Sequence, residues 1–181
     1  MLYVRQSLGP KEKLVHVGRF HWLYTANAVF SIFWGFFWAV VVIAAAILLQ
    51  QKTGFKLSPD FSPNDPIWIQ VMKLHWGIKI AALSLVAIGI WKFMHQMVIR
   101  ATTEIAVTST RVIYKRGLLA RYVGEISIDR IEGVNVIQTM PGRVFDFGNI
   151  IIRGMGVGEV ILPPIMQPLK FRRAIEYARQ V

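Results

Sequence analysis

The side chains best suited to chemistry in this 181-residue sequence are four histidines, His16, His21, His75 and His95. His21 and His95 flank two apolar stretches, so a helical hairpin would bring them near the same membrane face. Two imidazoles in that position can ligate a haem iron axially. The alternative is a pair of interfacial histidines whose polar tips lie among lipid headgroups. No acidic residue accompanies either histidine, so we expect no metal site and no bound cofactor. Haem binding, or a role in transport, is the remote alternative.

Catalytic residues are also not expected. The sequence contains no cysteine and therefore no thiolate nucleophile. Asp60 and Asp65 lie in a proline-rich loop in which nothing fixes the geometry of a carboxylate pair. Gly154–Gly158 has the glycine richness of a phosphate-binding loop, but it lacks the Lys-Ser/Thr of a P-loop, and a strand is expected to follow it. We predict that the protein is not an enzyme.

The elements that would position these residues begin with an uncharged run at 22–51. At about 1.5 Å per residue it exceeds a hydrocarbon core roughly 30 Å thick. A second apolar stretch, 70–98, is interrupted by Lys73, Lys79 and Lys92. We expect Lys79 and Lys92 to extend toward opposite membrane surfaces, and a buried charge in a transport path is the alternative.

The positive-inside rule gives an orientation. From Arg100 onward the chain carries twelve basic and seven acidic residues, which favours both termini in the cytoplasm. The formal net charge of +11 then favours contact with an anionic lipid leaflet over binding of nucleic acid. The predicted division is a cytoplasmic segment 1–21, a transmembrane helix 22–51, a periplasmic loop 52–69, a second transmembrane helix 70–98 and a cytoplasmic domain 100–181. The protein is accordingly expected to be a multi-pass membrane protein with both termini in the cytoplasm.

The pattern changes after Arg100 to short segments rich in β-branched and aromatic residues, separated by turn signals. Residues 104–108 alternate apolar with polar side chains, which predicts an antiparallel sheet with one face in water. Pro168 precedes a segment with helical spacing. The region is expected to form six or seven strands and a closing helix, as a small barrel or sandwich.

Residues 103–175 resemble the membrane-flanking bacterial pleckstrin-homology (PH) domain of the second type. The similarity rests on several short motifs together: Thr108–Ile113, Gly117–Leu119, Glu125–Ile131, Val134–Thr139 with Gly142-Arg143, and Phe147-Gly148. The lead into the first span, Leu8–Glu12 and His21-Trp22, is also similar. The resemblance implies an α+β membrane protein, with a two-helix anchor followed by a PH-like antiparallel β-barrel that a C-terminal helix closes. It also implies that the membrane is the bacterial inner membrane.

The same resemblance implies a non-catalytic membrane adaptor. PH-like domains of other kinds bind phosphoinositides, but bacteria largely lack these lipids, so that function is not carried over. We therefore predict an adaptor that contacts other membrane proteins or copies of itself, as an accessory or assembly factor of a larger complex. The alternative is binding of anionic lipid headgroups or sensing of the membrane surface.

Two sets of side chains are the candidates for these contacts. The aromatic set in the first span faces lipid, the second span or another membrane protein, and consists of Phe30, Phe33, Trp34, Phe37 and Trp38. The basic set faces anionic headgroups or serves only as solubilising charge, and consists of Arg111, Lys115, Arg116, Arg121, Lys170, Arg172 and Arg173.

Overall fold

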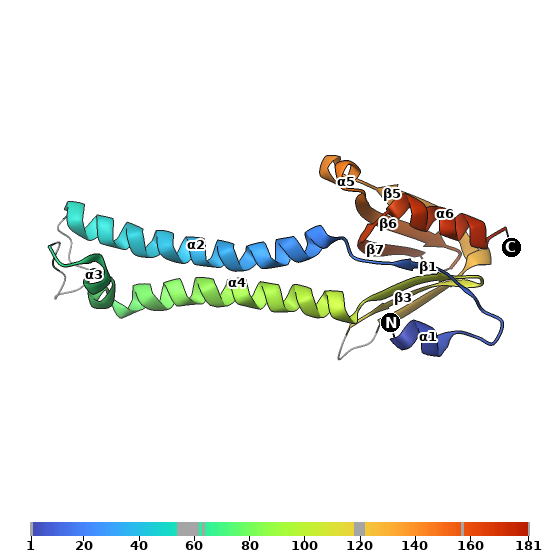
Figure 1. The fold of residues 1–181 in the computed structure, drawn as a ribbon, viewed down its shortest axis with the longest axis horizontal. Helices are drawn as coiled ribbons and strands as arrows, with labels where there is room; N and C mark the ends of the chain where they lie inside the picture. Colours follow the sequence, from blue (N-terminus) through green and yellow to red (C-terminus); the bar gives the residue numbers. More distant parts are fainter. Residues whose placement is uncertain (1, 54–61, 63, 118–121, 157, 181) are drawn as a thin grey trace. The chain divides into compact units, whose positions relative to one another are not determined.

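The computed structural model describes every residue except 1, 54–61, 63, 118–121, 157 and 181, and the chain divides into two compact units. We call residues 1–25 with 97–181 the sheet unit, and residues 26–96 the helical unit. Figure 1 shows the elements, which are in chain order α1 (Leu2–Ser7), β1 (Leu14–Gly18), α2 (Trp22–Thr53), α3 (Ile67–Lys73), α4 (Trp76–Thr102), β2 (Glu104–Thr108), β3 (Arg111–Arg116), β4 (Tyr122–Ser127), η1 (Ile128–Arg130), β5 (Ile131–Ile137), α5 (Met140–Val144), β6 (Phe147–Gly154), β7 (Gly158–Met166) and α6 (Pro168–Ala178).

Two antiparallel sheets build the sheet unit, with strand orders β1-β2-β3-β4 and β5-β6-β7. Within the described residues, a single isolated bridge between Phe20 and Ile165 joins the segment after β1 to β7. The α+β class predicted from the sequence is therefore present, but the structure shows two sheets and not a closed barrel.

The core of the sheet unit lies between the two sheets and α6. β6 follows the alternation expected of a strand with one buried face, since Ile150 and Ile152 are fully buried and their neighbours less so. α6 buries Phe171, Ile175 and Ala178, whose spacing places them on one face of a helix. The predicted closing helix thus contributes directly to the core.

The outer face of β2 differs from the expectation of a water-exposed face at 104–108. Ala106 and Thr108 on that face are fully buried. Val4 of α1 packs against Ala106 and Ile113, and the Thr108 hydroxyl donates a hydrogen bond to Glu12 at 2.6 Å. Glu104 accepts hydrogen bonds from the Val4 and Tyr3 backbone N–H groups, at 3.1 and 3.4 Å. A short N-terminal helix, absent from the sequence analysis, therefore covers this face.

The N-terminal segment also supplies a strand. β1 pairs with β2 in antiparallel register, for example Val17 with Ala106 and Gly18 with Ile105. Residues 1–25 therefore belong to the same compact unit as residues 97–181. The two long helices are an insertion between two neighbouring strands of one sheet.

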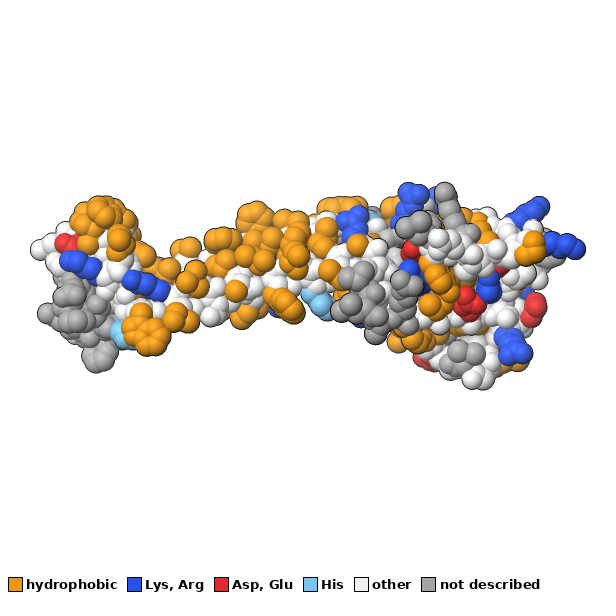
Figure 2. Space-filling view, turned by 90° about the horizontal axis from the view of Figure 1, so that it is seen from below, with side chains coloured by type: hydrophobic (Ala, Val, Ile, Leu, Met, Phe, Trp, Pro, Cys, Tyr) orange, Lys and Arg blue, Asp and Glu red, His pale blue; other side chains and the backbone are white. Residues whose placement is uncertain are grey.

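The helical unit contains most of α2 and α4 together with α3. Both long helices are long and apolar enough to cross a membrane, and most of the surface of each is exposed in the isolated chain. Figure 2 shows hydrophobic side chains distributed along the length of this segment. The segment predicted as one span at 70–98 is broken at Leu74, which has extended backbone, so that α3 ends before α4 begins at Trp76.

Candidate functional site

The aromatic candidates form one continuous exposed band on α2. Phe30 stacks on Trp34 with ring centroids 5.8 Å apart, and Trp34 stacks on Phe37 at 5.5 Å. Trp38 meets both Trp34 and Phe37 edge to face. Each of these rings, and that of Phe33, is about half exposed or more.

The opposite face of α2 packs against α4 through small residues. Gly35 lies so close to α4 that a Cβ there would be 2.8 Å from the Leu85 carbonyl oxygen, and a Cβ on Gly89 would be 2.7 Å from the Ser31 carbonyl oxygen. Ser31 Oγ donates a hydrogen bond to the Gly89 carbonyl at 3.1 Å. Small residues permit such close helix contact in membranes. The aromatic band is therefore not the packing surface against the second span, and lipid or another protein remain as its neighbours.

The basic candidates do not form one cluster. Arg111 and Arg116 lie at opposite ends of β3, and Arg121 lies outside the described residues. Lys170, Arg172 and Arg173 lie on α6, where Arg172 pairs with Glu176 at 2.8 Å. Lys170 and Arg173 are exposed.

Arg111 holds the N-terminal segment rather than presenting its charge to solvent. Its guanidinium donates to Glu12 at 2.9 and 3.0 Å, to Glu125 at 2.8 Å and to the Ser7 carbonyl at 2.6 Å. Thr108 Oγ1 accepts from the Arg111 N–H at 3.0 Å and closes the turn before β3. This explains in structural terms the Thr108-x-x-Arg111 pattern that was noted in the sequence.

The Glu12 carboxylate is held in its charged form by these contacts. Burial alone would raise its pKa. Hydrogen bonds from the Gly9 N–H, Thr108, Thr110 and Arg111 outweigh burial and lower the pKa of Glu12 from 4.5 to about 2. Its side chain is only 6% exposed, so the ion pair with Arg111 is shielded from solvent.

Lys115 also contacts other residues of the sheet unit. Its Nζ lies 4.0 Å from Glu104 Oε1 and 5.1 Å from the centre of the Tyr3 ring. Arg116 is exposed. Of the predicted cations on β3, Arg116 is the one available to a ligand.

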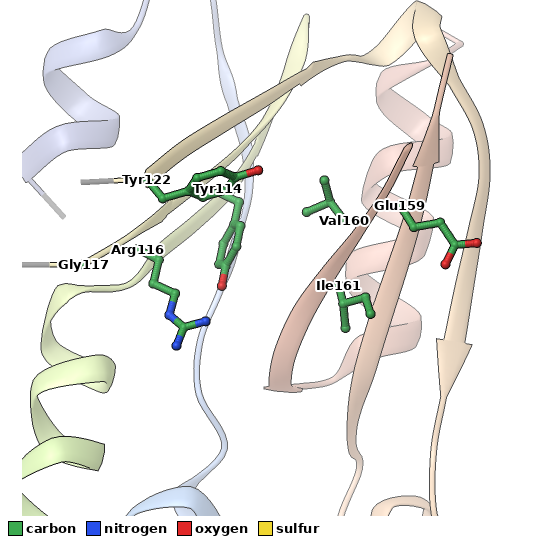
Figure 3. Close-up of a pocket in the computed structure, with 7 residues that line it drawn as sticks. All are labelled: Tyr114, Arg116, Gly117, Tyr122, Glu159, Val160 and Ile161. Atoms are coloured by element: carbon green, nitrogen blue, oxygen red, sulfur yellow. The ribbon is translucent and has the colours of Figure 1, made fainter. Parts of the chain in front are cut away.

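Arg116 opens onto a cleft of about 440 Å³ that the sequence analysis did not identify. Figure 3 shows Tyr114, Arg116 and Tyr122 on one wall and β7 with Val160 and Ile161 on the other. The lining residues are Tyr114, Arg116, Gly117, Tyr122, Glu159, Val160 and Ile161.

The register of the β3–β4 hairpin builds the aromatic wall. Arg116 pairs with Tyr122 and Tyr114 with Gly124, so the three wall side chains point to the same face. The Tyr114 and Tyr122 rings meet edge to face with centroids 6.4 Å apart. The sequence signal for this wall would have been a hairpin register in which Arg116 pairs with Tyr122.

The β7 wall presents the edge of a strand. Three consecutive residues, Glu159 to Ile161, line the cleft although successive side chains of a strand point to opposite faces. β7 pairs with β6 on one side, and on its other side the described residues provide only the bridge at Ile165. Glu159 is ion-paired with Arg153 at 2.7 Å, so the charge in the cleft is dominated by Arg116.

The histidines considered for haem lie in different surroundings. His21 is buried, stacks on Phe147 with centroids 5.1 Å apart and accepts a hydrogen bond from the Leu23 N–H. His95 is exposed on α4. In the part of the chain that the structure describes, no group of three metal-ligating side chains occurs.

Two sheets of four and three strands, a C-terminal helix in the core and a cleft between the sheets define a PH-like domain with an inserted helical pair. The sequence pattern of the family described as "Bacterial PH domain" matches residues 14–179. The chain therefore belongs to the bacterial PH domain family, and the match includes β1, both long helices and α6. No curated protein and no solved structure matches the chain.

Proposed function

We propose that this protein is a non-catalytic adaptor of the bacterial inner membrane, anchored by α2 and α4, whose PH domain lies in the cytoplasm and binds an extended segment of a partner. The partner is another membrane protein, for which the chain acts as an accessory or assembly factor, or a second copy of the chain. The observation that carries the proposal is the β7 edge exposed in the cleft.

Strand addition is the mode of binding that suits this edge. An extended peptide gains main-chain hydrogen bonds from an unpaired strand edge, and neighbouring pockets select its side chains. Here the second wall offers the exposed Tyr122 ring for apolar contact and the Arg116 guanidinium for a carboxylate. The preferred segment would accordingly be extended, with one acidic residue beside apolar ones.

The chemistry of the cleft supports binding rather than catalysis. Its one carboxylate, Glu159, is committed to Arg153, and its other polar groups are two phenols and a guanidinium. These groups are suited to apolar contact and to hydrogen bonds with a bound segment.

The membrane anchorage is supported by the composition and exposure of the two helices. Their outer surfaces are apolar, and their mutual contact uses Gly35, Gly89 and Ser31, which is the packing typical of membrane helices. Lys79 donates a hydrogen bond to the Met72 carbonyl of α3, so its ammonium extends toward the start of α4.

Site-specific photo-crosslinking in bacterial membranes tests the adaptor proposal. A photoreactive residue at Ile161, which is 58% exposed in the cleft, should give a discrete adduct. The same residue at Glu132, exposed on β5, should give none. Arg116→Glu should weaken the Ile161 adduct, because the guanidinium would be replaced by a carboxylate. Absence of an adduct at Ile161, or equal adducts at both positions, would contradict the proposal.

Headgroup binding is the second candidate function, favoured by one observation. Four exposed arginines lie in the sheet unit: Arg19 just before α2, Arg100 near the end of α4, Arg116 on β3 and Arg143 on α5. Each is worth about 1 kcal/mol near an anionic surface. Hydrogen exchange of β3 and α5 in nanodiscs should slow when anionic lipid replaces zwitterionic lipid at low salt, and identical exchange in both would exclude this function.

A further inference from the structure

A second surface of the sheet unit is apolar without being part of the core. It is formed by Met140, Val144 and Phe145 in and after α5, which we call the apolar knob. Met140 and Val144 are 78% and 79% exposed, and Phe145 is 48% exposed. In Figure 1, α5 projects from the end of β5 and β6, beyond the sheet. Three neighbouring apolar side chains that are this exposed are not expected in a turn that contacts only water.

The knob is held in place by the polar residues beneath it. Gln138 Nε2 donates hydrogen bonds to the Gly142 and Phe147 carbonyl oxygens, both at 3.2 Å. Thr139 Oγ1 accepts from the Gly142 N–H at 3.3 Å and caps α5. These residues hold the backbone so that the apolar side chains are directed outward, and they coincide with the Gln-Thr…Gly-Arg…Phe-Gly pattern of the sequence.

Close packing leaves no room for side chains under the knob. A Cβ on Gly142 would lie 2.6 Å from the Phe147 carbonyl oxygen, and a Cβ on Gly148 would lie 2.7 Å from the Ile137 carbonyl oxygen. The backbone of the knob is therefore held in one conformation by its packing within the sheet unit.

The position of the knob identifies what it contacts. The Phe145 ring meets the Trp22 ring edge to face, with centroids 6.2 Å apart. Trp22 is the first residue of α2 and is 57% exposed. Tryptophan at the end of a spanning helix lies at the headgroup level, so a knob in contact with Trp22 lies at the same depth.

We propose that the apolar knob inserts into the boundary between headgroups and acyl chains, as a third membrane contact beside α2 and α4. Arg143, exposed on the same short helix, would then contact lipid phosphates while Met140 and Val144 enter the acyl region. The inference rests on the proposed membrane anchorage of α2 and goes beyond the partner-binding cleft. It assigns α5 a role in fixing the sheet unit against the bilayer surface.

Fluorescence quenching by brominated lipids tests the insertion on the full chain in liposomes. Because the native sequence has no cysteine, single cysteines can carry an environment-sensitive dye. Met140→Cys reports on the knob, and Met155→Cys is the matched control, since Met155 is an exposed methionine at the opposite end of β6. Val40→Cys, exposed on α2, reports on the anchorage itself.

The expected result is quenching at positions 140 and 40 by about twofold or more, with little at 155. Quenching at 40 with none at 140 would overturn the insertion and leave the anchorage standing. Absence of quenching at 40 would overturn the anchorage and the insertion with it. Equal quenching at 140 and 155 would show that the knob has no special contact and would also overturn the inference.

Discussion

Arg111 binds both carboxylate oxygens of Glu12, with Nε 3.0 Å from Oε1 and Nη2 2.9 Å from Oε2. The two residues are 99 positions apart, and the pair joins the N-terminal segment to the turn that opens β3. A residue that sequence analysis proposed as a headgroup contact is thus part of the internal structure. The local sequence around Arg111 does not reveal its shielded acidic partner, because that partner lies in a distant segment of the chain.

Replacing Arg111 with alanine should destabilise the sheet unit. Glu12 would remain shielded and lose its bidentate partner, which should lower the free energy of unfolding by about 2–4 kcal/mol. Chemical unfolding of the full chain in detergent, followed by tryptophan fluorescence, measures the change. Arg153→Ala is the matched control, because its pair with Glu159 is about half exposed and should cost no more than about 0.5 kcal/mol. Equal effects of the two substitutions would show that the Glu12–Arg111 pair stabilises the fold no more than the exposed Arg153–Glu159 pair does.

Acid should weaken the fold through Glu12. Its pKa falls from 4.5 to about 2 on folding, so its contribution is complete above about pH 4.5 and is lost as the pH falls toward 2. The contribution is about 2–3 kcal/mol. Unfolding midpoints measured from pH 7 to pH 2.5 should decline less steeply for Glu12→Gln than for the unsubstituted chain. Parallel pH profiles would contradict the assignment.

Gly35→Val should separate the two long helices. The new side chain would meet the Leu85 carbonyl oxygen, since even a Cβ would lie 2.8 Å from it, and the backbone must move to accommodate it. The expected cost is about 1–3 kcal/mol in resistance of the helical unit to denaturation by SDS. Ala44→Val places a valine at an exposed position of α2 and should have little effect.

The aromatic band should matter for assembly and not for folding. Replacing Phe33, Trp34 and Phe37 with leucine keeps the surface apolar but removes the stacked rings. If the band contacts a partner, larger species on blue-native gels should be lost while the helical content is retained. Leucine at Trp76 and Trp91, which are exposed on α4, controls for general loss of aromatic surface. Unchanged assembly in the triple variant would leave lipid as the neighbour of the band.

Gln138→Ala should loosen the apolar knob. Two hydrogen bonds to the Gly142 and Phe147 carbonyls would be lost, each worth about 1 kcal/mol. Amide exchange of residues 140–145 should accelerate, whereas the equivalent change at exposed Asn135 of β5 should leave it unaltered. Unchanged exchange in Gln138→Ala would show that the knob does not depend on this brace.

The sequence was most informative where the signal was local. The uncharged run at 22–51 closely matches α2, the β-branched segments after Arg100 correspond to strands, and the segment after Pro168 is a helix. The motifs that resemble the family proved to be structural: Thr108 and Arg111 secure a turn, and Gln138 and Gly142 build the knob.

What the sequence did not predict depends on contacts between distant segments. β1 is five residues long and is a strand because β2 provides its hydrogen bonds, which no local pattern reveals. Burial of the outer face of β2 requires α1, and the cleft requires the two sheets to be packed together. The break at Leu74 interrupts an apolar segment whose composition alone does not mark it.

The pairing of β1 with β2 also determines the order in which the chain can fold during synthesis. Residues 19–103 separate the two strands, and they include both long apolar helices. A nascent chain cannot close this sheet until both helices have been synthesised and β2 has left the ribosome. β1 can therefore join its sheet only after both long helices have been synthesised, so the sheet unit completes its folding last.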